Sequence, residues 1–349
     1  MKKTFLPALR ELQRTLDAAT DSPLTMFAKV VSLTVMNMRY EKMAFDRKLK
    51  SHPFILTRGI VEDALRMFRN MREAGFIEAQ DKTVHGWKSR RKEEKHHQVF
   101  GALWAGYDAK QFEEYIRRYE RRITVNRLQP LIAGKSCVDL GCGNGNFLFA
   151  LLRHGAGRGV GVDFGAENIS CARTYARHKR QGGRTRFVCS SIYRTGLPEG
   201  AFDFAIQNGV FHHLDDEGRA IREARRILKP GAWFWYYTDG EGGISYDLWD
   251  ASVHMLRDVP VEFIAGVLER MNIDRNKVVH LLDGLQATYA HTSWKKITSR
   301  LARHGFGNFR RLTGGFPTDF DLDVIQADRY GRAKFGEGDL RILCQVIRK

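Results

Sequence analysis

The sequence has few cysteines and no pair of them in a CxxC arrangement. Five Cys occur in 349 residues, and none precedes Cys137. Three of them (Cys137, Cys189 and Cys344) lie in short apolar runs typical of strands, where a free thiol packs as a small apolar group. These features favour a reducing compartment and predict neither a disulfide framework nor a bound metal.

Long apolar runs are also missing. The longest apolar window covers residues 24–38 and contains Lys29, and it is shorter than the ~20 residues that a membrane-spanning helix needs. The basic start at Lys2 and Lys3 is followed by a charged stretch rather than the apolar core of a signal peptide. We therefore expect a soluble, cytoplasmic protein with no membrane span.

Charge and aromatic residues are plentiful. The 22 Phe, 11 Tyr and 6 Trp exclude a disordered chain, and 57 Lys and Arg against 40 Asp and Glu give a net charge of +17. Residues 1–130 hold 26 of these basic residues and 16 of the acidic ones, so the surplus is largest there. The charge leaves a polyanionic partner open, and the length predicts two or three domains.

The first 125 residues have a helical pattern. Phe5, Leu9, Leu12 and Leu16 share one helix face, and two further helices are expected between residues 24 and 75. The charged run 88–97 is interpreted as a solvated linker or helix face. An apolar stripe (Phe112, Tyr115, Ile116, Tyr119 and Ile123) predicts another helix, with Arg117, Arg118, Arg121 and Arg122 on its other side. We interpret the stripe as core rather than as a nucleic-acid platform.

Strands and helices alternate from residue 136 onwards. Strands are expected at 136–140, 159–163, 185–189, 202–207 and 232–238, with the clearest helices at 166–179 and 217–228. This order predicts an α/β fold with a parallel sheet covered by helices on both faces and a ligand site beyond the carboxyl ends of the strands. Residues 241–291 interrupt the pattern with helices, and strands return at 309–312 and 340–347.

The richest motif is the segment 138–147, VDLGCGNGNF. A strand enters a turn with glycines at 141, 143 and 145, and a helix begins near Asn146, so the turn predicts a cradle for a polar group. Eighteen residues past Gly145, the next strand ends in Asp163, near the spacing at which a carboxylate accepts hydrogen bonds from a ribose diol. Asn146 stands where the dinucleotide motif GxGxxG needs glycine, which disfavours a hydride-transferring enzyme.

These motifs resemble the class I S-adenosylmethionine-dependent methyltransferases. The resemblance covers residues 126–240 and is carried by 138–147, by Val162-Asp163-Phe164, by LPEGAFD at 197–203, by QNGVFHHL at 207–214 and by ILKPGA at 227–232. It implies a Rossmann-like seven-stranded sheet with helices on both faces and an antiparallel last strand. The helical patterns described above add to this core an N-terminal helical region and a helical insertion after the fifth strand. The predicted domains are 1–125 (helical extension or lid), 126–240 (core), 241–291 (insertion, substrate lid) and 292–349 (end of the core).

The resemblance also implies roles for individual residues. S-adenosyl-L-methionine would be the cofactor, with Asp139 and the loop Gly141, Cys142, Gly143, Asn144 and Gly145 holding its methionine part. Asp163 would bind the ribose and Phe164 would cover the adenine. Ser190, Ser191 and Ile192 align where many relatives place an Asp for the adenine amino group, and Asn208 ends the fourth strand above the cofactor.

Methyl transfer to an acceptor that carries a proton also requires a base. His212 and His213 follow the strand that bears Asn208, and either is a candidate because an ordinary histidine pKa suits proton removal near neutral pH. His291 is a second candidate. Trp249, Phe263, Tyr246 and Tyr289 are expected to line the acceptor pocket under the lid.

The favoured hypothesis is a methyltransferase acting on O, N or C of a small or medium-sized metabolite, such as an envelope sugar or a natural-product scaffold. One alternative is an RNA or protein methyltransferase, although no compact RNA-binding module is recognisable in the first 125 residues. A second alternative is a cofactor-binding fold with a non-methylating role.

Overall fold

The computed structural model describes residues 3–19, 22–75, 109–286 and 289–347. Within these residues the chain forms two compact units, each assembled from three separate stretches. One unit takes its residues from Met1–Arg90, Glu241–Gln286 and Val324–Gly336, and the other from Arg91–Gly240, Ala287–Asp323 and Glu337–Lys349. A short helix, α14 (Leu322–Gln326), crosses from the second unit to the first. The predicted charged run 88–97 lies outside the described residues.

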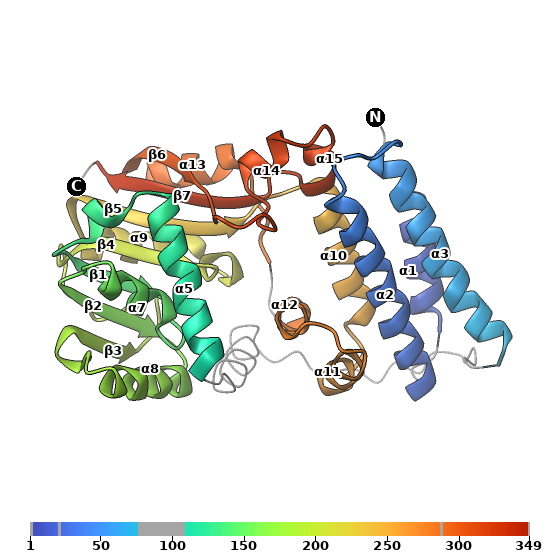
Figure 1. Ribbon diagram of the computed structural model, residues 1–349, viewed down its shortest axis with the longest axis horizontal. Helices are drawn as coiled ribbons and strands as arrows, with labels where there is room; N and C mark the ends of the chain where they lie inside the picture. Colours follow the sequence, from blue (N-terminus) through green and yellow to red (C-terminus); the bar gives the residue numbers. More distant parts are fainter. Residues whose placement is uncertain (1–2, 20–21, 76–108, 287–288, 348–349) are drawn as a thin grey trace. The chain divides into compact units, whose positions relative to one another are not determined.

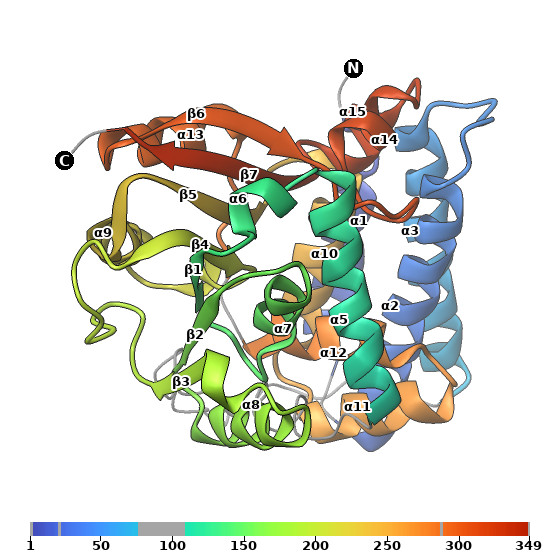
Figure 2. The ribbon, with the colours of Figure 1, turned by 60° about the vertical axis from the view of Figure 1, so that its left-hand side comes forward.

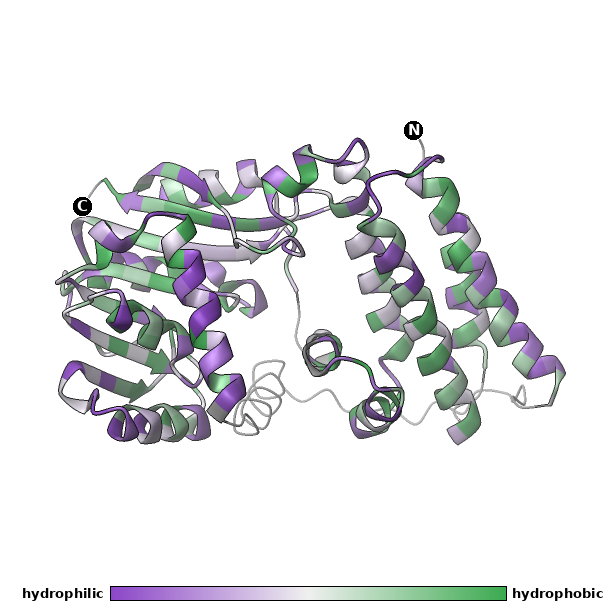
Figure 3. Cartoon of the chain, viewed as in Figure 1, coloured by the Kyte–Doolittle hydropathy of each residue, from purple (hydrophilic) through white to green (hydrophobic). Residues whose placement is uncertain are grey.

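The first unit is helical. Its helices are α1 (Leu6–Asp17), α2 (Pro23–Ala44), α3 (Pro53–Glu73), α10 (Gly243–Leu256), α11 (Val261–Arg270), α12 (Arg275–Gln286) and α15 (Gly331–Phe335). The start of α2 follows from its sequence, because Ser22 Oγ accepts the amide hydrogen of Thr25 at 3.1 Å and Pro23 occupies the first turn. Hydrophobic and hydrophilic residues alternate along these helices, as Figure 3 shows. None of the helices in the described ranges combines the length and the apolar composition that crossing a membrane requires.

The N-terminal helices and the insertion helices belong to the same unit. Helix α2 packs against α3 on one side and against α10 and α11 on the other. Polar contacts join them, since Asn37 Nδ2 donates to Ser252 Oγ at 2.9 Å and the hydroxyls of Tyr40 and Ser245 are hydrogen-bonded at 3.1 Å. This grouping differs from the sequence-based division, which treated 1–125 and 241–291 as separate parts.

The second unit holds a sheet of seven strands. They are β1 (Ser136–Leu140), β2 (Arg158–Asp163), β3 (Thr185–Cys189), β4 (Phe202–Asn208), β5 (Leu228–Asp239), β6 (Phe306–Leu312) and β7 (Asp339–Val346). They lie in the order β3-β2-β1-β4-β5-β7-β6, which can be followed in Figure 1. Strand β7 runs antiparallel to both its neighbours, while the pairs among β1 to β5 are parallel. The predicted α/β fold, its seven strands and its antiparallel last strand are confirmed.

Helices cover both faces of this sheet, because side chains alternate along each strand. Val138 and Leu140 face a core completed by α9 (Glu217–Ile227) and α13 (Trp294–Arg303). Cys137 faces the opposite core, formed with α5 (Ala109–Val125), α7 (Asn146–Arg153) and α8 (Ala166–His178). The short segments α6 (Gln129–Ile132), η1 (Gly182–Arg184) and η2 (Phe211–His213) join these elements. Figure 2 shows α5 lying along α7.

The apolar stripe of α5 is core, as predicted, with Phe112, Ile116 and Ile123 buried. One expectation for this helix was wrong. Arg122 was placed on its polar side, whereas its side chain is buried. The reason is a buried group of carboxylates from the C-terminal part of the chain, described below, which supplies the opposite charge.

Candidate active site

A pocket opens at the carboxyl edge of the sheet, where β1, β2 and β4 end side by side. Asp139 near the end of β1 pairs in register with Gly161 of β2 and Ile206 of β4, so the turns that follow these strands meet there. Most of the residues predicted for the cofactor and for catalysis line this pocket: Asp139, Gly141, Cys142, Gly143, Asn144, Asp163, Phe164, Ser191, Ile192, Asn208 and His213. Gly145, Ser190 and His212 are outside the pocket lining.

The turn between β1 and α7 depends on glycine. Gly141, Gly143 and Gly145 all have positive φ, at 81°, 52° and 87°, which favours residues without a Cβ. A Cβ on Gly141 would lie 2.5 Å from Cγ2 of Val210, and one on Gly145 would lie 3.0 Å from the ring of Phe149. The glycines therefore let the turn pack tightly, and Gly145 precedes α7 as its N-cap residue.

Asp163 fixes the shape of this turn from the neighbouring strand. Its Oδ2 accepts the amide hydrogen of Gly143 at 2.8 Å. Its Oδ1 accepts the amide hydrogen of Gly165 at 2.8 Å and one from Asn168 Nδ2 at 3.2 Å. A carboxylate has about four lone-pair sites, so capacity remains for one hydroxyl donor from a ligand.

Asp139 lies deeper in the pocket, where its side chain is buried. Burial, together with the nearby charge of Asp163, raises the pKa of this carboxyl to about 8. The ionised form is therefore costly unless a cation comes close. Such a carboxyl is suited to an ammonium group, whose charge would favour loss of the proton.

Buried amide groups in the same pocket have hydrogen-bonding capacity to spare. Among the described residues, Asn144 Nδ2 and both polar side-chain atoms of Asn146 are buried without a hydrogen-bond partner. Both residues line the pocket. Buried polar atoms are normally satisfied, so these amides mark the pocket as one built for a polar ligand.

The end of β4 is held by side chains that the sequence analysis did not single out. Gln207 donates through Nε2 to the carbonyl of Tyr237 at 2.7 Å, and its Oε1 accepts the amide hydrogen of Val210 at 3.2 Å. Trp235 Nε1 donates to Oδ1 of Asn208 at 3.3 Å, which orients the amide of Asn208. The turn that carries the two histidines is therefore anchored to β5.

The two candidate histidines differ in their surroundings. His213 is half-buried and lines the pocket. His212 is buried, and burial lowers its pKa to about 3, with a smaller contribution from His291. His212 is therefore neutral at physiological pH. Its Nε2 lies 2.9 Å from Nε2 of His213, so one of these nitrogens donates and the other accepts.

Tyr119 and Phe147 also form part of the pocket wall, although the sequence analysis gave neither a role in the site. Their rings stack at 4.4 Å with an interplanar angle of 9°. Phe147 belongs to the glycine motif, so its place at the site could have been inferred. Tyr119 comes from α5, and only its position in the apolar stripe hinted at burial. Further lining residues are Gly165, Asn168, Tyr193, Gly209, Val210 and Leu214.

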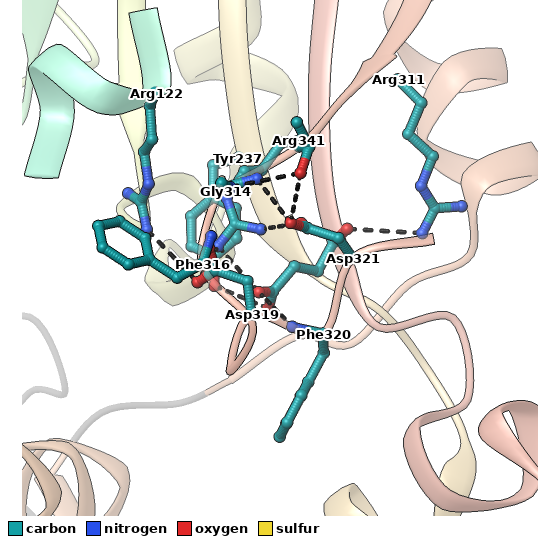
Figure 4. A network of polar contacts seen from close by, with 12 residues as sticks. Arg122, Tyr237, Arg311, Gly314, Phe316, Asp319, Phe320, Asp321 and Arg341 are labelled. Atoms are coloured by element: carbon teal, nitrogen blue, oxygen red, sulfur yellow. Dashed lines mark hydrogen bonds and ion pairs between the residues drawn. The ribbon is translucent and has the colours of Figure 1, made fainter. Parts of the chain in front are cut away.

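A buried network of ion pairs supports one side of the site (Figure 4). Arg341 near the start of β7 pairs with Asp321 through Nη1, and its Nη2 lies 2.8 Å from Asp339 and 3.4 Å from Asp319. Burial opposes the charge of Arg341, but these carboxylates and Tyr237 outweigh it and raise the pKa of the guanidinium. The same cation holds the pKa of Asp339 below its usual range despite burial.

The network reaches residues that shape the pocket. Arg122 lies 3.9 Å from Asp319, and its guanidinium sits 5.4 Å from the ring centre of Tyr119. Burial, together with the charge of Arg341, lowers the pKa of Arg122 to about 10. At the other end of the network, the guanidinium carbon of Arg341 lies 5.0 Å from the centre of the Tyr237 ring. This ring lies beside the pocket residue Gly209, since a Cβ added to Gly209 would be 3.5 Å from it.

The remaining predicted residues are outside the pocket lining. Trp249, Phe263 and Tyr246 belong to the helical unit, so their place in an acceptor pocket stays a prediction. Tyr289 lies beside His212 and His213, and His291 lies next to Tyr289. Within the described part of the chain, no group of three or more His, Cys, Asp or Glu side chains is arranged to hold a metal ion.

Comparison with known proteins agrees with this architecture. Residues 138–236 match the family model described as "Methyltransferase domain". This match, together with the sheet order and the glycine turn, identifies a methyltransferase domain of the class I type, as the motifs predicted.

Similar proteins include several methyltransferases. The chain is 27% identical over 149 residues to a ubiquinone biosynthesis O-methyltransferase of Thiobacillus denitrificans, covering 42% of this chain and 60% of that one. It is 30% identical over 101 residues to a 2-phytyl-1,4-naphtoquinone methyltransferase of Trichormus variabilis, covering 28% of this chain and 44% of that one. The chain therefore spans less than two thirds of either relative.

Among solved structures, the chain resembles the 1,6-didemethyltoxoflavin-N1-methyltransferase of Burkholderia thailandensis, crystallised with S-adenosylhomocysteine. The TM-score is 0.45 at 17% identity, covering 76% of this chain and 94% of that one.

Proposed function

We propose that this protein transfers a methyl group from S-adenosylmethionine to a small molecule. The observation that carries the proposal is the coincidence, in one pocket of a methyltransferase domain, of the buried carboxyl of Asp139, the glycine turn and the Asp163 carboxylate. Bound S-adenosylmethionine supplies an electrophilic methyl group on a sulfonium. The residues of the chain then have to bind, orient and exclude water.

The pocket offers a partner for each part of this cofactor. Asp139 and the unsatisfied amides of Asn144 and Asn146 would hold the amino and carboxylate groups of the methionine part. Asp163 would accept from a ribose hydroxyl with the capacity left after its three local hydrogen bonds. Phe164, whose side chain is 59% exposed, would cover the adenine.

Of the two serines predicted near the adenine, Ser191 is the better placed. It lines the pocket, whereas the hydroxyl of Ser190 donates to the carbonyl of Arg194 at 3.1 Å. We therefore assign the adenine amino contact to Ser191, with Ile192 packing beside it.

His213 is the proposed base for acceptors that lose a proton. It is the histidine of the pair that lines the pocket, and it follows Asn208 along the same turn. His212 is buried and outside the lining, so we assign it no direct contact with the acceptor.

A small-molecule acceptor is supported by the relatives, which are named for ubiquinone biosynthesis and for a phytylated naphthoquinone. The acceptor of this chain would be a metabolite with an O, N or C nucleophile. Methylation of RNA or protein, and ligand binding without methyl transfer, remain the alternatives that the test must separate.

The test has two parts. Isothermal titration should show one S-adenosylhomocysteine site that is weakened by Asp163→Asn and retained in Asp203→Asn. Asp203 is a suitable control because it bonds to Lys229 and to the amide of Ser136 at the amino end of β1, outside the pocket lining.

Protein supplied with methyl-labelled S-adenosylmethionine and cell extract should then label a small molecule. Label in RNA or in protein would support the first alternative. Cofactor binding with no labelled product in any fraction would support the second.

A further inference from the structure

The segment that follows the insertion places an aromatic ring against the histidine pair. The centre of the Tyr289 ring lies 4.4 Å from that of His213, with the two planes at 84°. The same ring stacks on His212 at 5.3 Å and 29°. The rings of His212 and His213 are themselves 4.1 Å apart at 86°, so each of the three rings contacts the other two.

We propose that Tyr289 and His212 are positioning residues that together fix the imidazole of His213 at the acceptor pocket. This inference rests on the proposed function, in which His213 is the base. It assigns a role to residues 289–292, which lie far from the glycine motif in the sequence and outside the matched domain 138–236.

Backbone hydrogen bonds hold Tyr289 in place. The amide of Ala290 donates to the carbonyl of His212 at 3.0 Å, and the amide of Thr292 donates to the carbonyl of Asp239 at 3.2 Å. Gly240 and Thr292 form a parallel bridge, and Ser293 then caps α13. The segment is thus tied to η2 and to the end of β5, so the backbone at Tyr289 cannot move away from His213 without breaking these bonds.

His212 engages one ring nitrogen of His213. Nε2 of His213 lies 2.9 Å from Nε2 of His212, so one of these nitrogens donates and the other accepts. When Nε2 of His213 donates, His212 accepts as a neutral imidazole. When His213 takes an acceptor proton, it becomes an imidazolium with a hydrogen on both nitrogens, and the hydrogen bond to His212 is kept.

The two contacts restrict different motions. The hydrogen bond between His213 and His212 opposes a flip of the His213 imidazole about its second side-chain torsion, since a flip would put Cε1 in the place of Nε2. The Tyr289 ring fills the space beside the imidazole and opposes a change of rotamer. A base displaced by about 1 Å loses on the order of a hundredfold in rate, so both restraints should be measurable.

Four variants test the proposal. Tyr289→Phe keeps the ring and Tyr289→Leu removes it, while His212→Gln keeps a polar group that can reach Nε2 of His213 and His212→Leu does not. Tyr175→Leu is the matched control, because Tyr175 stacks on Phe112 at 4.2 Å in the core of the same unit, outside the pocket lining.

The first readout does not need an acceptor. With ¹³Cε1-labelled histidine and S-adenosylhomocysteine bound, the His213 resonance, assigned with His213→Gln, should shift in Tyr289→Leu and His212→Leu. It should stay in place in Tyr289→Phe and Tyr175→Leu. An unchanged His213 resonance in both leucine variants would overturn the inference even if the protein proves to be a methyltransferase.

The second readout is turnover of the acceptor found by labelling. The leucine variants should lose about a hundredfold in kcat while KM for S-adenosylmethionine stays within about twofold. Tyr289→Phe and His212→Gln should recover most of kcat. Equal loss in Tyr289→Phe and Tyr289→Leu would overturn positioning by the ring. If one leucine variant fails to bind S-adenosylhomocysteine, the other leucine variant and the two conservative variants still decide the question.

If His213→Gln itself keeps full turnover, the assignment of the base in the proposed function fails. The resonance experiment then still reports whether Tyr289 and His212 hold the ring.

Discussion

The amide of Gly143 donates to Oδ2 of Asp163 at 2.8 Å, which ties the glycine turn after β1 to the end of β2. The same carboxylate is the proposed ribose ligand. Asp163 therefore shapes the glycine turn, and it does so without a ligand being present. Contact with the ligand is its second, proposed role.

Asp163→Asn should weaken S-adenosylhomocysteine binding by about 10- to 100-fold, because hydrogen bonds to a charged group contribute ~1.5–3 kcal/mol. An asparagine can accept from Gly165 but cannot accept from both Gly143 and Gly165. Titration calorimetry on Asp163→Asn and on the control Asp203→Asn measures this difference. Equal affinities in the two variants would show that Asp163 is not a ligand.

The raised pKa of Asp139 predicts that cofactor binding depends on pH. At about pH 8 this carboxyl is half protonated, and below that value it is mostly neutral. An ammonium group favours the ionised form, so affinity for S-adenosylmethionine should rise by up to about tenfold per pH unit as pH rises towards 8 and then level off. Calorimetry from pH 6 to 9 should also detect release of a proton on binding. Asp139→Asn should remove the slope, and a slope that persists in this variant would assign it to another group.

Removing Arg341, the central cation of the buried network, should lower the free energy of unfolding. Arg341→Met leaves Asp319, Asp321 and Asp339 without their central partner, and breaking a buried ion pair typically costs ~3–5 kcal/mol of unfolding free energy. Arg303→Met, at an exposed position in the last turn of α13, should cost less than about 1 kcal/mol. Urea denaturation compares the two, and equal midpoints would mean that the carboxylates are neutral in the native state.

Gly141→Ala should impair both folding and ligand binding. The new Cβ would meet Val210 at 2.5 Å in a backbone conformation with φ of +81°. Gly134→Ala is the matched control, because its φ is +72° but no atom lies within 4 Å of its Cβ position. The control should lose about 1–2 kcal/mol from strain alone, and Gly141→Ala should lose a further ~1–3 kcal/mol from crowding. Thermal or urea unfolding measures both. Adding Val210→Ala should restore part of the second loss, and no recovery would locate the crowding elsewhere.

Most residues that line the candidate site could be predicted from the sequence because their signals are local. Asp139, the glycines and Asn144 occur in one run of ten residues, and Asp163 follows at a spacing set by one helix and one strand. The order of strands and helices likewise predicted the parallel sheet and its layers.

The rest depends on contacts between distant segments, for which the sequence has no periodic signal. Tyr119 reaches the site by stacking on Phe147, and Tyr289 is held beside His213 by backbone bonds of its segment to η2 and to the end of β5. Arg122 was expected on a polar helix face because its counter-charge, Asp319, lies almost two hundred residues later. The packing of α2 against α10 in one unit was not predicted, because these two helices are also far apart in the sequence.

The position of β7 has a consequence for how the sheet is built during synthesis. Last of the seven strands to leave the ribosome, β7 lies between β5 and β6, which are made before it. Until it arrives, β6 has no strand partner, and the edge of β5 that β7 later covers is open. Arg341 arrives with β7, so the carboxylate of Asp321 lacks its cation until then. Pairing of β7 with β5 and β6, beside the ion network, is therefore the last step in forming the sheet. Until then the nascent chain has an unpaired strand edge that chaperones can bind.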